Sequence, residues 1–280
     1  MIEPRYYRFI ASDGYAFHVM KWRPVGPPLG QIVILHGVQS HGGWYHQLGH
    51  NLAESGFEAH FPDRRGSGSN ERERGHASTA RRLILDISEF LGAIKTLNPG
   101  RKTALAGISW GGKLAVLNAG YHPDRVDALA LICPGLHPRV GVSMSERARI
   151  FLSFLTDRTK RFPIPLSDPA LFTASPVGQR FIAADSLGLR DATSSLLMVS
   201  MFIDLRVSSI PKRVRQPVLL MLAGQDRIVD NRKTDAFFKR LASSDREVIE
   251  YDDAHHTLEF EPDPSTYARD LASWLSRVLH

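Results

Sequence analysis

Hydrophobic residues in this chain fall into short, nearly continuous runs that alternate with longer stretches of helical periodicity. Near-continuous hydrophobicity predicts strands that are buried on both faces, as in parallel sheets. Apolar positions that recur at helical spacing predict the intervening helices. The runs that predict strands cover residues 31–36, 57–61, 103–108, 128–133, 217–222 and 247–251, and the helical patterns cover 44–54, 79–97, 110–121, 232–241 and 265–279.

Residues 5–23 show a different pattern, in which apolar and polar positions alternate around Asp13-Gly14. This pattern predicts an antiparallel hairpin with a tight turn. Together with the alternating strands and helices, it predicts a doubly wound α/β fold. We expect an eight-stranded, mostly parallel sheet with helices on both faces.

The alternation fails from about residue 137 to residue 216, where Pro-rich stretches bracket helical patterns and no strand is expected. We interpret residues 137–216 as an inserted helical cap, and residues 1–136 and 217–280 as the core. The cap helices either bury their apolar faces on the core or cover an apolar pocket. In the second case, the expected pocket residues are Met144, Phe151, Leu155, Met198 and Phe202.

The formal net charge of +6 is concentrated in this same segment. Residues 137–216 hold twelve Lys and Arg against six Asp and Glu, whereas the rest of the chain is balanced at twenty-three of each. No nucleic-acid-binding motif accompanies the basic residues, so no nucleic-acid partner is expected. A basic and apolar cap instead predicts transient contact with anionic membrane surfaces.

The cysteine count and the first residues of the chain indicate the cellular compartment. The single cysteine, Cys133, cannot form an intramolecular disulfide, and the opening residues lack the apolar stretch of a secretory signal. No apolar run approaches the roughly 20 residues that span a bilayer. These features predict a cytoplasmic protein, peripheral at membranes if the cap docks there.

The segment GISWGG, residues 107–112, carries the strongest chemical signal. A Gly-x-Ser-x-Gly sequence after a strand and before a helix is typical of a nucleophile elbow, which exposes its serine at the carboxyl end of the strand. We therefore predict Ser109 as a nucleophile. A serine hydroxyl needs a base within hydrogen-bond reach and a group that orients that base.

Candidates for these partners follow the last two predicted strands. Asp226 is the expected acid, with Asp230 interpreted as a helix cap and Asp252 or Asp253 as alternatives. For the base, the spacing does not separate His255 from His256. The chain order Ser, Asp, His is the order used by this kind of site.

A tetrahedral intermediate also needs two backbone N–H donors. The expected donors are Trp110, directly after the nucleophile, and Val38, in the loop after an early strand. PDRRGSGS, residues 62–69, lacks the spacing of a dinucleotide or phosphate loop and predicts a turn that holds Asp63 and Arg64 in hydrogen bonds. No metal site is expected, because no histidine pair has the spacing of helical metal ligands. No cofactor is expected either, since the chain shows no dinucleotide or phosphate loop.

Five motifs together resemble the α/β-hydrolase superfamily, and within it the monoacylglycerol lipase and lysophospholipase group. HGVQSHGGWY is similar to that group's HGxxxHxxRY, and GISWGG is similar to its elbow. PDRRGSGSNERERG resembles its D-x-x-G-x-G-x-S stretch, which is followed by a charged loop. AGQDRIVD and DAHHTLEFEP resemble its acid and histidine loops. The last resemblance selects His256 over His255. Ile108 and Trp110 depart from the group's G-H-S-M-G elbow, and Trp110 brings a large ring near the oxyanion site.

The resemblance implies hydrolysis of acyl esters through an acyl-serine intermediate, with a cap that forms the acyl tunnel. We expect a serine esterase that acts on monoacylglycerol-like or lysophospholipid-like esters. Other serine-triad hydrolases remain as alternatives: thioesterases, acyltransferases, carbon–carbon bond hydrolases and proline iminopeptidases. A non-catalytic homologue that binds a ligand is a further alternative.

Overall fold

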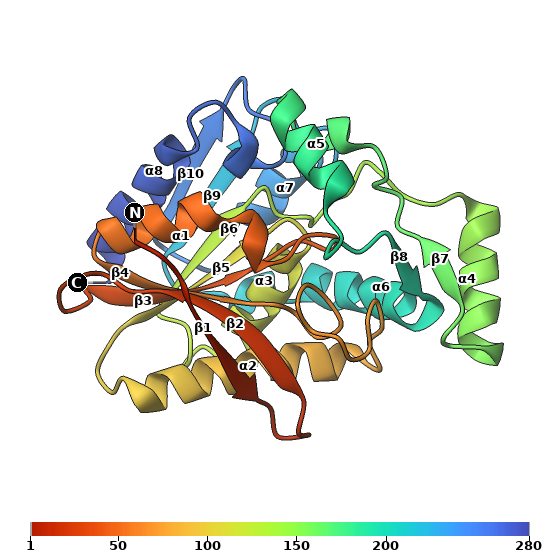
Figure 1. Ribbon diagram of the computed structural model, residues 1–280, viewed down its shortest axis with the longest axis horizontal. Helices are drawn as coiled ribbons and strands as arrows, with labels where there is room; N and C mark the ends of the chain where they lie inside the picture. Colours follow the sequence, from red (N-terminus) through yellow and green to blue (C-terminus); the bar gives the residue numbers. More distant parts are fainter. Residues whose placement is uncertain (1, 280) are drawn as a thin grey trace.

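An eight-stranded sheet forms the centre of the molecule, which we describe for residues 2–279 from a computed structural model (Figure 1). The strands lie in the order β1-β2-β4-β3-β5-β6-β9-β10. Strand β2 pairs antiparallel with both β1 and β4, and the other pairings are parallel. The bounds are β1 Arg5–Ile10, β2 Ala16–Trp22, β3 Gly30–Leu35, β4 Phe57–Pro62, β5 Thr103–Ile108, β6 Ala128–Ile132, β9 Val218–Ala223 and β10 Arg246–Tyr251. The predicted fold class and all eight predicted strands are confirmed.

Helices cover both faces of the sheet, as its buried strands require. One hydrophobic cluster joins α1 and α8 to one face, and a second joins α2, α3 and α7 to the other. The core helices are α1 His46–Glu54, α2 Ala80–Leu97, α3 Gly111–Tyr121, α7 Asn231–Phe238 and α8 Ser265–Val278, with short 3₁₀ turns η1 Gly42–Trp44 and η4 Leu258–Phe260. The five helices predicted outside residues 137–216 are confirmed, with ends that differ by a few residues. None of the helices in residues 2–279 has the length and apolar character needed to cross a bilayer.

Residues 137–216, called the cap segment below, lie between the neighbouring strands β6 and β9. They contain α4 Met144–Thr156, β7 Arg161–Pro163, η2 Pro169–Leu171, α5 Pro176–Ala184, β8 Asp191–Thr193, α6 Ser194–Ser209 and η3 Pro211–Arg213. Helix α6 packs on α2 and α3, whereas α4 lies at the edge of the molecule, far from the sheet (Figure 1).

The expectation that the cap segment contains no strand was wrong. Strands β7 and β8 pair antiparallel, with Phe162 opposite Ala192. Three-residue strands are too short to produce a recognisable alternation of apolar and polar positions. Both side chains of this pair are buried.

Candidate active site

Ser109 lies in a strained turn between β5 and α3. Its φ of 52° falls in the left-handed region, which non-glycine residues rarely adopt. The helix can start this close to the sheet only because its first residues are glycines. A Cβ added at Gly111 would lie 2.3 Å from the carbonyl oxygen of Leu35. This turn presents the serine at the carboxyl end of its strand, as the motif predicts.

The structure brings Ser109, His256 and Asp226 together in one hydrogen-bonded chain. His256 Nε2 lies 2.8 Å from Ser109 Oγ, and His256 Nδ1 lies 2.7 Å from Asp226 Oδ2. The other carboxylate oxygen of Asp226 accepts the backbone N–H groups of Ile228 and Val229, at 2.8 Å each. His256 and Asp226 are buried. A fixed carboxylate thus holds the imidazole against the hydroxyl, the arrangement that makes a serine nucleophilic.

The alternative residues lie outside this chain of hydrogen bonds. Asp230 caps α7 by accepting the backbone N–H of Lys233, as expected from the sequence. Asp252 and Asp253 are exposed. His255 makes neither of the two hydrogen bonds that His256 forms with the serine and the aspartate.

Two backbone N–H groups border the serine, from Val38 and Trp110. Val38 lines the small cavity at Ser109 and His256. A Cβ at the preceding Gly37 would lie 3.6 Å from Ser109 Oγ, so this loop passes very close to the serine. Within residues 2–279, neither N–H donates a hydrogen bond to the protein. Both are therefore available to an oxygen that carries developing negative charge.

His36 fixes the peptide group that carries the Val38 N–H. Its Nδ1 lies 2.8 Å from the carbonyl oxygen of Gly37, and its Nε2 accepts the backbone N–H of Arg64 at 2.8 Å. Burial lowers the pKa of His36 to about 3, with the Arg64 charge adding to the effect. The ring is neutral at pH 7, so Nδ1 donates to Gly37 and holds its peptide plane.

The Arg64 side chain contacts both residues whose N–H groups border the serine. Its Nη2 donates to the carbonyl oxygen of Val38 at 3.0 Å, and its guanidinium lies 4.9 Å from the ring centroid of Trp110. The side chain is buried, and no carboxylate in residues 2–279 forms an ion pair with it. Burial lowers the pKa of Arg64 to about 10, which leaves the group charged at neutral pH.

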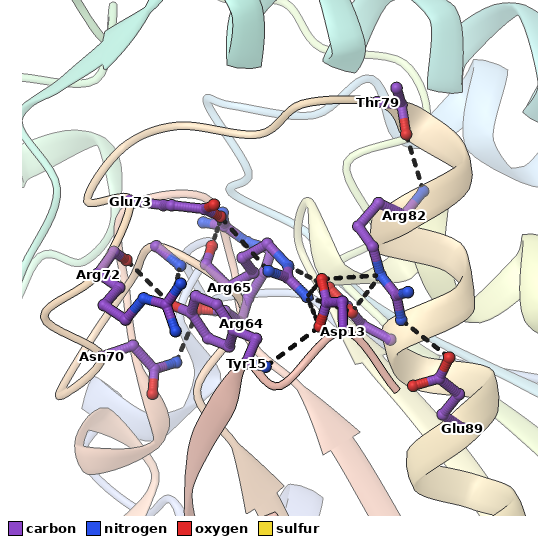
Figure 2. A network of polar contacts seen from close by, with 12 residues as sticks. Asp13, Tyr15, Arg64, Arg65, Asn70, Arg72, Glu73, Thr79, Arg82 and Glu89 are labelled. Atoms are coloured by element: carbon purple, nitrogen blue, oxygen red, sulfur yellow. Dashed lines mark hydrogen bonds and ion pairs between the residues drawn. The ribbon is translucent and has the colours of Figure 1, made fainter. Parts of the chain in front are cut away.

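The neighbouring Arg65 has the opposite environment (Figure 2). It forms ion pairs with Asp86 at 2.8 Å, Asp13 at 2.9 Å and Glu73 at 3.4 Å. Arg82 joins the same network through Asp86. Arg65 therefore anchors the loop between β4 and α2, whereas Arg64 lies beside the site without an ion pair to any of residues 2–279.

The turn predicted for PDRRGSGS is confirmed by the hydrogen bonds of its aspartate. Asp63 accepts backbone N–H groups from Gly42 and Ser69, at 2.8 Å each. The role of Arg64 beside Val38 was missed at the sequence level. The motif places the arginine directly after a strand, but it does not show which way the guanidinium points.

The Trp110 ring, expected near the oxyanion site, is turned toward the cap segment. Its Nε1 donates to Ser200 Oγ on α6 at 2.8 Å, and the ring is buried. Trp110 is not among the residues that line the small cavity at Ser109. Its large ring therefore lies outside that cavity.

The cap segment also contacts the histidine loop. The Phe172 ring lies 6.1 Å from the His256 ring, and the backbone N–H of Thr257 donates to the carbonyl oxygen of Phe172 at 2.9 Å. Asp185 of the cap segment accepts the Trp44 indole N–H at 2.8 Å. Two residues of the cap segment, Phe172 and Leu166, thus line the small cavity at Ser109.

The five residues expected to line the pocket lie elsewhere, so that expectation is corrected. None of them lines the cavity at Ser109. Met144, Phe151 and Leu155 on α4 are 77%, 52% and 64% exposed, and Met198 and Phe202 pack in a small cluster within the cap segment. Helical spacing showed that the α4 residues share a face, but not that this face points to solvent.

Three known proteins resemble this chain over most of its length. Monoglyceride lipase of Homo sapiens is 23% identical over 273 residues, which cover 96% of this chain and 89% of that protein. Monoacylglycerol lipase of Mycolicibacterium smegmatis is 23% identical over 260 residues, which cover 91% and 90%. The crystal structure of Paleococcus ferrophilus monoacylglycerol lipase superimposes with a TM-score of 0.83 at 23% identity, over 93% of this chain and 98% of that one.

A family model described as serine aminopeptidase, S33, matches residues 26–263, which include the whole cap segment and Ser109, Asp226 and His256. An α/β-hydrolase from Penicillium has the same fold, with a TM-score of 0.81 at 17% identity over 99% of both chains. The chain therefore belongs to the serine aminopeptidase S33 family and has the α/β-hydrolase fold.

Proposed function

We propose that the protein is a serine carboxylic-ester hydrolase that acts through an acyl-serine intermediate on monoacylglycerol-like or lysophospholipid-like esters. The observation that carries the proposal is the hydrogen-bonded chain from Ser109 through His256 to Asp226. The names of the relatives support the substrate class, since several are monoglyceride lipases.

In the proposed reaction, His256 Nε2 takes the proton of Ser109 as the serine oxygen attacks the ester carbonyl. Asp226 stabilises the imidazolium that results, and it does not take the proton itself. The N–H groups of Val38 and Trp110 donate to the oxyanion. His256 then protonates the departing alcohol, and water repeats the sequence on the acyl-serine.

The core, residues 1–136 and 217–280, supplies this chemistry, and residues 137–216 act as the cap. We propose that the exposed apolar residues of α4 insert into anionic lipid surfaces. Arg147 and Arg149 lie on the same helix, so charge attraction and apolar insertion act together. The cap would then meet the substrate at the membrane surface.

The test compares matched pairs of variants on a panel of substrates. Ser109→Ala and His256→Ala are expected to lower kcat on monoacylglycerols and p-nitrophenyl esters by at least about a thousandfold. His255→Ala, a change at the adjacent histidine, should leave the rate near wild type. Asp226→Asn should lower kcat strongly, whereas Asp230→Asn should affect α7 stability only.

The panel also contains thioesters and aminoacyl anilides, and a fluorophosphonate probe reports the nucleophile. Labelling of Ser109 without hydrolysis of any oxygen ester would contradict the ester assignment and favour another serine-triad hydrolase. A protein that neither labels nor hydrolyses would be a non-catalytic homologue. Wild-type rates in Ser109→Ala would contradict the mechanism.

A further inference from the structure

Gln39 lies at the junction of two cavities. It lines the small cavity at Ser109, and it also lines a larger cavity of about 580 Å³ within the cap segment. Phe162, Ile164 and Pro169 make much of the wall of the larger cavity apolar. A molecule that extends from the serine into the larger cavity would therefore pass Gln39.

The side-chain amide of Gln39 is buried and makes no hydrogen bond within residues 2–279. The residue is 2% exposed, and neither Nε2 nor Oε1 has a hydrogen-bond partner in residues 2–279. Its backbone is held, because its carbonyl oxygen accepts the N–H of Leu189 at 3.0 Å. Burying an unpaired amide costs free energy, so this position favours a ligand group that pairs with it.

A hydroxyl group fits this amide best, because it accepts a hydrogen bond from Nε2 and donates one to Oε1. We propose that Gln39 is a specificity residue that binds a hydroxyl group near the scissile bond of an ester whose remaining part enters the larger cavity. The inference rests on the proposed esterase function. The hydroxyl belongs either to the alcohol or to the acyl chain of the substrate.

An anionic group is not favoured in the larger cavity, although two arginines line it. Arg161 is paired with Asp191, and Arg190 donates to backbone carbonyls at the end of α5, including that of Ile182. Both guanidinium groups therefore already have hydrogen-bond or ion-pair partners within the protein. The residues that line the larger cavity therefore favour a neutral hydroxyl group over an anionic group.

The experiment measures kcat/KM for two pairs of esters that differ only in hydroxyl groups. One pair is monooctanoylglycerol and propyl octanoate, and the other is ethyl 3-hydroxyoctanoate and ethyl octanoate. The pair in which the hydroxylated ester has the higher kcat/KM identifies whether the alcohol or the acyl chain carries the hydroxyl. The readout is the ratio within a pair, so a variant that is partly unfolded still gives a valid value.

In at least one pair, the wild type should prefer the hydroxylated ester by about tenfold, the factor given by hydrogen bonds of ordinary net strength. Gln39→Leu and Gln39→Met should bring that ratio close to one. The matched control is Gln47→Leu, which removes an amide on α1 outside both cavities and should keep the wild-type ratio.

Two results would overturn the inference while leaving the esterase intact: no preference in either pair, or a wild-type preference that Gln39→Leu retains. Failure of the proposed function is distinct, because the wild type would then hydrolyse none of the four esters. That result would remove both proposals.

Discussion

Arg64 is a single buried residue that holds both loops beside the serine. Its guanidinium contacts the Val38 carbonyl and the Trp110 ring, and it forms no ion pair with a carboxylate of residues 2–279. Under the proposed mechanism, it is a positioning residue for the oxyanion donors and places positive charge behind them. A buried cation without an ion pair costs stability, and its field can stabilise negative charge that develops at the site.

We predict that Arg64→Met lowers kcat by about tenfold to a hundredfold with little change in KM, less than the loss of a direct oxyanion donor. Arg64→Lys should recover part of the rate, since it keeps the charge and loses the fork geometry. The measurement that separates this role from simple stability is the affinity for a trifluoromethyl ketone. Its affinity should fall in parallel with kcat/KM. A change in melting temperature alone, with ketone affinity intact, would contradict the prediction.

Glu259 provides a second residue-level prediction, for pH-dependent stability. It is buried beneath α1, where it accepts the backbone N–H groups of Gln47 and Leu48, and it pairs with the Tyr267 hydroxyl. Burial raises the pKa of Glu259 to about 7, against hydrogen bonds that favour the carboxylate. The folded protein therefore binds a proton that the unfolded chain releases near its ordinary value of 4.5.

The neutral Glu259 stabilises the fold fully below pH 4.5, and this contribution is lost as the pH rises towards 7. The gap between the two pKa values corresponds to about 3 kcal/mol of unfolding free energy. Urea denaturation of the wild type and Glu259→Gln across this range should give curves whose difference changes by about that amount. A difference that does not depend on pH would contradict the assignment.

How far the sequence predicts individual residues depends on what each motif encodes. The serine, the aspartate and the preference for His256 follow from motifs whose spacing fixes their place at strand ends. Gln39 and Arg64 follow no such rule, because their roles depend on side-chain direction and on which buried groups lack partners. Met144 was expected to line the pocket but is exposed, for the same reason: helical spacing defines which residues share a face but not what that face contacts.

At the level of elements, the turn from β5 to α3 depends on backbone contacts that admit no side chain. A Cβ at Gly111 would lie 2.3 Å from the Leu35 carbonyl oxygen, whereas a Cβ at Gly26 would meet nothing within 4 Å. We predict that Gly111→Ala lowers the unfolding free energy by about 1–3 kcal/mol or more and displaces Ser109, while Gly26→Ala is neutral. Urea unfolding and the rate of fluorophosphonate labelling test the two effects. Equal stability and labelling in both variants would contradict the close approach.

The regularity of the apolar pattern explains which elements the sequence predicts. Buried parallel strands and long amphipathic helices bear continuous patterns, and these were recognised. The short helices and strands of the cap segment bear no such continuous pattern. Ser175 followed by Pro176, at the start of α5, is nevertheless a recognisable helix start. Strands β7 and β8 are held by tertiary contacts around Phe162, which no local pattern encodes.

At the level of the whole molecule, the exposed face of α4 makes the proposed lipid contact testable. Replacing Met144, Phe151 and Leu155 by Ser should reduce flotation with anionic liposomes by at least about tenfold, since three apolar insertions are lost. The matched control is Leu97→Ser, a change at an exposed leucine on α2. Raising salt should weaken binding of the wild type through its basic residues. Binding that is equal in the triple variant, or in liposomes without anionic lipid, would contradict docking through the cap segment.

The Trp110 indole bond to Ser200 has a consequence for any exchange of the cap segment. The residue that follows the serine is tied to α6, and Phe172 rests against the imidazole of His256. A replacement segment that lacks Ser200 and Phe172 would lose both contacts and would disturb the reacting groups along with the entrance. Substitutions within the existing cap segment that keep these two residues preserve both contacts, so they can alter substrate preference with less disturbance of the triad.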